Sequence, residues 1–173
     1  MSARAYELAN RFDRATDRLV ELVRTMSDQA WTARAEGAGW TVAQEALHLG
    51  VWMEIEGAWF ARLVDGKYSL PLSMEAADHI NANLIAENPA PTREQVLLEI
   101  VGNRTLVRHL LIRLSDEDLE REIPRRRAFL GGGEDTIGIA HLARHMLVGH
   151  IERHVRTIEE TIAAHEDEPA AAV

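Results

Sequence analysis

Histidines are the residues whose type and spacing point most directly to chemistry in this sequence. The chain of 173 residues has eight histidines, and His141, His145, His150 and His154 follow one another in the last long helical segment. They form two pairs with four-residue spacing, which in a helix places two imidazoles one turn apart on the same face. Neutral imidazole is a good ligand for divalent transition metals. Each pair is therefore a candidate for half of a metal site.

The position of each pair relative to the apolar face of its helix separates the two candidates. With about 100° per residue and His141 at zero, His145 lies near 40°, His150 near 180° and His154 near 220°. The apolar stripe of this segment spans roughly 240° to 320°. Its members are Leu147, Ile151, Val155, Ile158 and Ile162. We therefore expect His150 and His154 to border the core, and His141 and His145 to point largely away from it into solvent.

His48 is the candidate third ligand, and it lies in an earlier helical segment beside Ile55 and Trp59 on the core side. Together with His150 and His154 it would provide three neutral nitrogen ligands and leave a coordination position open, as a catalytic metal requires. Two alternatives remain at this point. A four-residue histidine pair arises readily by chance in a histidine-rich helix, and His48 can be a core histidine with satisfied hydrogen bonds.

Four long amphipathic segments must position these histidines. The periodicity of apolar residues predicts helices over 3–26, 42–64, 92–114 and 136–165, with a short extra helix over 74–87. Thr41 with Gln44 forms a capping box at the start of the second long helix. We expect a loop over 121–135, and no sheet, because no segment alternates convincingly with period two. The predicted fold is all-α: a four-helix bundle over 1–165 followed by a frayed acidic and alanine-rich tail, 166–173.

Composition narrows the classes of function. The net charge of −9 argues against nucleic-acid binding. The chain has no cysteine, which excludes thiolate ligands and a cysteine nucleophile, so any thiol must come from outside. We expect no membrane span and no secretory signal, and therefore a cytoplasmic location. The arginines at 125–127 are a candidate grip for a small anion, although solvated loop arginines are the simpler interpretation.

Three stretches of the sequence resemble the DinB-like superfamily, which includes thiol-dependent S-transferases and mycothiol-dependent maleylpyruvate isomerases. They are Trp40–Leu49, Asn83–Leu119 and Gly149–Val155. The resemblance implies a four-helix bundle in which one histidine of the second helix and two of the last helix bind a divalent metal. At the matching positions stand His48, His150 and His154. In some thiol-dependent members one ligand on the last helix is a carboxylate, and this chain has His150 there.

The resulting hypothesis is a metal-dependent enzyme of the thiol S-transferase or isomerase type, acting on a small molecule. Nickel or zinc suits three imidazoles best, and iron or manganese is an alternative. The metal would activate a low-molecular-weight thiol, such as mycothiol, or water. Glu45 and Glu56 are weak catalytic candidates, either orienting a ligand histidine or acting as a base. The alternatives are a non-catalytic metal- or ligand-binding stress protein and a structural bundle that forms a homodimer.

Overall fold

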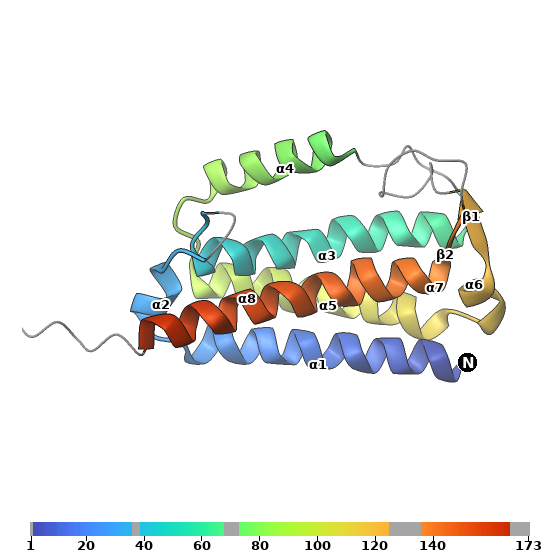
Figure 1. Cartoon of the computed structure of the whole chain (residues 1–173), viewed down its shortest axis with the longest axis horizontal. Coiled ribbons are helices and arrows are strands. Elements are labelled where there is room, and N and C mark those ends of the chain that lie inside the picture. Colours follow the sequence, from blue (N-terminus) through green and yellow to red (C-terminus); the bar gives the residue numbers. More distant parts are fainter. Residues whose placement is uncertain (1, 36–38, 68–72, 125–135, 167–173) are drawn as a thin grey trace, which may run out of the picture.

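Four long helices form the body of the computed structural model, which describes residues 2–35, 39–67, 73–124 and 136–166. They are α1 (Ala3–Thr25), α3 (Val42–Val64), α5 (Arg93–Arg113) and α8 (Gly149–Glu166). The helices lie side by side, and α1 and α3 each pack against both α5 and α8 (Figure 1). The predicted all-α fold is confirmed, and the bounds of the first three long helices agree with the expected ones within one residue.

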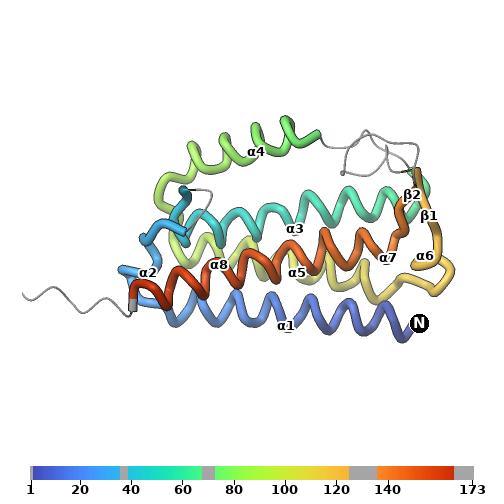
Figure 2. The backbone as a smooth tube through the Cα atoms, viewed as in Figure 1, coloured from blue at the N-terminus to red at the C-terminus, as the bar shows by residue number. Residues whose placement is uncertain are grey.

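The path of the chain determines which helices are neighbours (Figure 2). Helices α1 and α8 run in one direction, and α3 and α5 run in the other. Because α3 and α5 are parallel, the chain must return along the bundle between them, and helix α4 (Met74–Glu87) makes this return on the outer side of α3. Helix α4 is the short extra helix that the sequence predicts.

Side-chain caps explain where most helices begin. Thr41 and Gln44 form the predicted capping box at the start of α3. Ser115 and Asp118 form a second one at the start of the short helix α6 (Asp116–Glu120). The short helix α2 (Asp28–Thr32) begins at Ser27, whose hydroxyl accepts a hydrogen bond from the amide of Ala30. The sequence analysis missed α2, because five residues are too few to show a periodic pattern.

The segment before α8 differs from the sequence prediction. Strands β1 (Glu122–Pro124) and β2 (Thr136–Gly138) form a short antiparallel ribbon where we expected only loop. Each strand is three residues long, too short for alternation to reveal it. The last helical segment begins at Ile139 rather than 136, as α7 (Ile139–Leu142), and continues through a π-helix, η2 (Ala143–Val148), into α8. The arginines at 125–127 and residues 167–173 of the predicted tail lie outside the described residues.

The core lies between the long helices, and the apolar stripes predicted from the sequence line it. Its largest fully buried side chains include Phe12, Phe60 and Leu147. Helices α3 and α5 approach closely at Gly50, where a Cβ atom would lie 2.7 Å from the Cβ atom of Glu99. None of the helices in the described part of the chain is long and apolar enough to cross a membrane.

Candidate metal centre

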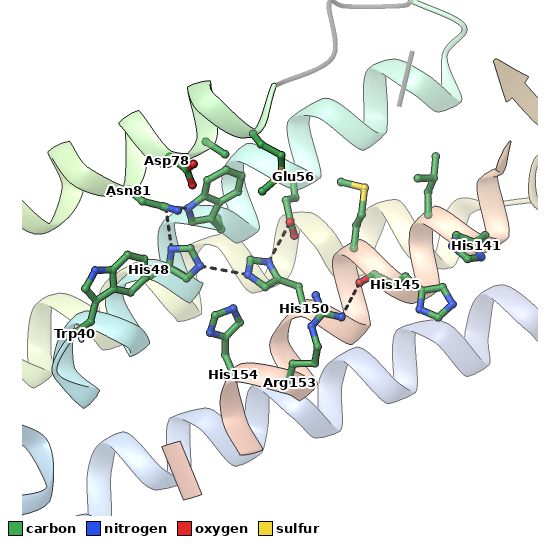
Figure 3. Close-up of a pocket in the computed structure, with 15 residues that line it drawn as sticks. Trp40, His48, Glu56, Asp78, Asn81, His141, His145, His150, Arg153 and His154 are labelled. Carbon is green, nitrogen blue, oxygen red and sulfur yellow. Dashed lines mark hydrogen bonds and ion pairs between the residues drawn. The ribbon is translucent and has the colours of Figure 1, made fainter. Parts of the chain in front are cut away.

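Helices α3 and α8 bring His48, His150 and His154 together. One ring nitrogen from each histidine lies within 4.8 Å of the other two (Figure 3). The Nε2 atoms of His48 and His150 are 3.3 Å apart. Tetrahedral ligands at the usual zinc–nitrogen distance have nitrogens about 3.3 Å apart, so this pair is already at ligand spacing. The three histidines chosen from the sequence therefore form one cluster, and their arrangement fits a divalent metal ion.

Each of these imidazoles is held through its other nitrogen, Nδ1. The Nδ1 atom of His48 lies 3.1 Å from Oδ1 of Asn81, and that of His150 lies 3.0 Å from Oε1 of Glu56. The Nδ1 atom of His154 contacts Oε1 of Glu45. Oxygen partners on the outer nitrogen fix the orientation of ligand histidines in metal sites, and such partners contribute strongly to metal affinity. Glu45 and Glu56, the two weak catalytic candidates, thus contact the proposed ligands.

Asn81 of α4 determines which nitrogen of His48 carries the proton. Its Oδ1 atom accepts a hydrogen bond of 2.7 Å from Nε1 of Trp52, which can only donate. The same oxygen faces Nδ1 of His48, so this nitrogen must also donate. The lone pair of His48 is therefore on Nε2, the atom that points toward His150. The sequence analysis did not find Asn81, because the weak pattern of α4 gives no indication of which of its faces covers α3.

Burial controls the protonation of the site. Desolvation, with a smaller contribution from the neighbouring histidines, lowers the pKa of His48 to about 3. Desolvation, with smaller contributions from His154 and the positive charge of Arg153, lowers the pKa of His150 to about 3. Both rings are therefore neutral near pH 7, with a lone pair available to a metal. Desolvation also raises the pKa of the Glu56 carboxyl to about 8. Glu45 is 3% exposed, and its Oε2 atom has no hydrogen-bond partner among the described residues.

A cavity of about 530 Å³ opens beside the three histidines. Trp40 and Trp52 line it near His48, and Met74, Ala77 and Asp78 line it from α4. The cavity leaves room for a small molecule next to the three imidazoles. Structural metal sites, which are closed by four protein ligands, lack such room.

His141 and His145 point away from the core, as expected, but they line the same cavity, whereas the sequence analysis placed them in solvent with no part in the site. Both side chains are exposed, and their ring centroids are 4.2 Å apart. The π-helix explains why they share the cavity with the second pair: the amide of Gly149 donates to the carbonyl of Arg144, five residues earlier. A π-turn contains about one residue more than an α-turn. The five-residue step from His145 to His150 therefore completes a turn, and both histidine pairs face the cavity.

Comparison with known proteins agrees with the fold and with the imidazole cluster. No curated protein and no solved structure matches the chain. The sequence profile of the DinB superfamily matches residues 11–158, which include all three histidines of the cluster, the whole of α3 and α5, and parts of α1 and α8. This chain belongs to the DinB superfamily.

Proposed function

We propose that the protein is a divalent-metal-dependent enzyme of the thiol S-transferase or isomerase type. The observation that carries the proposal is the convergence of His48, His150 and His154 at the edge of a cavity large enough for a small substrate. Membership in the DinB superfamily supports it. Three protein ligands leave at least one coordination position for a substrate atom.

The residues of the chain have separable roles in this proposal. His48, His150 and His154 hold the ion, and Asn81, Glu56 and Glu45 keep the three rings in place through their Nδ1 atoms. A bound divalent cation supplies Lewis acidity, which lowers the pKa of a thiol or water beside it. Because all three ligands are neutral, they leave the full positive charge of the ion available for that purpose.

We propose two reactants. The nucleophile is a low-molecular-weight thiol or water, and the other substrate is a small electrophile. The chain has no cysteine, so a thiol would enter the cavity from solution. Trp40 and Trp52 form apolar walls next to His48 and would exclude bulk water from the thiolate or hydroxide. Zinc and nickel are the proposed ions, and iron and manganese are the alternatives.

Metal analysis of the untagged protein tests the centre. We expect about one equivalent of metal per chain, lost in the triple variant His48→Ala, His150→Ala, His154→Ala. The matched control replaces His79, His109 and His165 by alanine, which removes as many histidines elsewhere and should leave the metal in place. A wild-type protein that binds no nickel, zinc, iron or manganese after incubation with each ion would refute the centre.

Turnover is tested separately on the metal-loaded protein. Small electrophiles are supplied with each candidate thiol and without thiol, and consumption of the electrophile is compared between wild type and the triple histidine variant. Metal-dependent consumption in the wild type alone supports the enzyme. Bound metal with no turnover of any thiol or of water would instead favour a metal-binding protein without catalysis.

A further inference from the structure

Arg153 is a cation on the wall of the cavity that forms no ion pair with any described residue. Its Nη1 atom makes one long contact, 3.4 Å, with the carbonyl oxygen of His145. Within the described part of the chain, no carboxylate lies at ion-pair distance from it. Arg11 of α1 differs in this respect, because it forms an ion pair with Glu152, the residue before Arg153, at 2.7 Å. The charge of Arg153 acts on Glu56 of the same cavity only from beyond ion-pair distance, so Arg153 retains its donors for another group.

Gly149 lets Arg153 lie along the helix toward His145. A Cβ atom at Gly149 would stand 3.4 Å from Nη1 of Arg153 and 3.0 Å from the carbonyl oxygen of Arg144. A side chain at this position would press on the carbonyl of Arg144 and take up space beside the guanidinium. The end of the π-helix thus positions the cation between the three-histidine centre and the second histidine pair (Figure 3).

The cavity has a polar wall and apolar surroundings. Arg153, His145 and His141 follow one another along the wall formed by α7, η2 and α8. Leu142 and Met146 lie on the same elements and also line the cavity. The carboxylate of the lining that does not contact a histidine belongs to Asp78, on the opposite side, in α4 (Figure 3). An anion would therefore bind on the α8 side.

We propose that this cavity binds an organic anion: an apolar body with a carboxylate, sulfonate or phosphate group that pairs with Arg153 and His145. Guanidinium matches the geometry of such oxyanions, and imidazole adds a donor. Trp52, Met146 and Leu142 contact the apolar body, next to the three histidines. As a statement of substrate class the inference rests on the proposed enzyme function, whereas the binding itself requires no metal.

Two fluorescent probes with the same aromatic body test the proposal. 8-Anilinonaphthalene-1-sulfonate carries the anion, and N-phenyl-1-naphthylamine lacks it. Binding is titrated by fluorescence with metal-free and metal-loaded protein. We expect Arg153→Gln to weaken binding of the sulfonate about tenfold and to leave binding of the neutral probe unchanged. Arg153→Lys, which keeps the charge but loses the planar fork, should weaken sulfonate binding less.

Arg156→Gln is the matched control, because Arg156 is an exposed arginine on the same helix outside the cavity lining. It should change neither affinity. Failure of the wild type to bind the sulfonate, or an equal effect of Arg153→Gln on both probes, would overturn the proposal. Since the metal-free protein is titrated as well, these outcomes do not depend on whether the metal centre exists.

Discussion

At the scale of single residues, Asn81 links three parts of the site. Its side-chain oxygen accepts hydrogen bonds from Trp52 and His48 of α3. Asn81 itself is half-buried on α4, where Ala77 is the buried residue. Residues that bind the outer nitrogen of a ligand histidine typically change metal affinity by about 10–100-fold when they are removed. The same oxygen also joins α4 to the bundle, so its loss affects both the imidazole and the cover of the cavity.

Replacement of Asn81 by alanine should therefore weaken metal binding by about 10–100-fold, because the His48 ring loses the partner that fixes its orientation and tautomer. The affinity is measured by competition with a chelator of known strength. Asn83→Ala is the control, since Asn83 lies on the same helix, is exposed, and is hydrogen-bonded to the exposed His79. Equal metal affinities of Asn81→Ala and wild type would show that Asn81 does not position the ligand.

The sequence predicted the proposed ligand residues better than their partners. The helical angles of about 100° per residue placed His150 and His154 beside the core. This placement agrees with the structure because both residues follow the π-helix, inside regular α8. The same angles gave His141 and His145 no part in the site, because His145 lies within the π-helix and His141 lies in α7 before it, and side-chain spacing does not reveal a change in the number of residues per turn. Asn81 was out of reach for a different reason: its contacts depend on how α4 crosses α3, and no local pattern encodes that crossing.

At the scale of elements, the close approach of α3 and α5 depends on Gly50. Alanine there should destabilise the protein by about 1–3 kcal/mol, since its Cβ atom would overlap the backbone and Cβ of α5. Gly102→Ala is the matched control in α5, because a Cβ atom added there would meet nothing within 4 Å. That change should stabilise the helix by up to about 1 kcal/mol. Chemical denaturation measures both, and a stabilising Gly50→Ala would contradict the packing argument.

The capping box of α6 predicts a dependence of stability on pH. Hydrogen bonds from the backbone and side chain of Ser115 lower the pKa of Asp118 below its usual 3.8. Folding therefore favours the ionised carboxylate. The resulting stability is complete above pH 3.8 and is lost as the pH falls through the lower pKa of the folded protein.

Asp118→Asn should accordingly lower the free energy of unfolding at neutral pH by about 0.5 kcal/mol, a small effect because the group is largely solvated. The difference from wild type should shrink toward zero as the pH falls through the lowered pKa of the folded protein, below 3.8. Urea denaturation across this pH range measures it. Glu117→Gln, an exposed neighbour in the same turn, is the control. A difference that stays constant with pH would show that the ionised carboxylate is not the cause.

At the scale of the whole molecule, the metal centre would join two helices that are far apart in the sequence. His48 belongs to α3 in the first third of the sequence, and His150 and His154 belong to the last helix. The family match covers residues 11–158 and thus includes both parts. Folding must bring these distant segments together before three ligands exist, so an ion that binds the cluster binds the folded state and not the unfolded chain.

Metal should consequently raise the melting temperature of the whole domain. At a free metal concentration about 100 times the dissociation constant, binding to the folded state alone stabilises it by about 2.7 kcal/mol. For a domain of this size that corresponds to an increase of about 5–11 °C. Calorimetry of the metal-free protein with and without added zinc or nickel measures the shift. The triple variant at His48, His150 and His154 should show no shift, whereas the control variant at His79, His109 and His165 should keep it. An equal shift in all three proteins would place the stabilising ion somewhere other than the α3–α8 cluster.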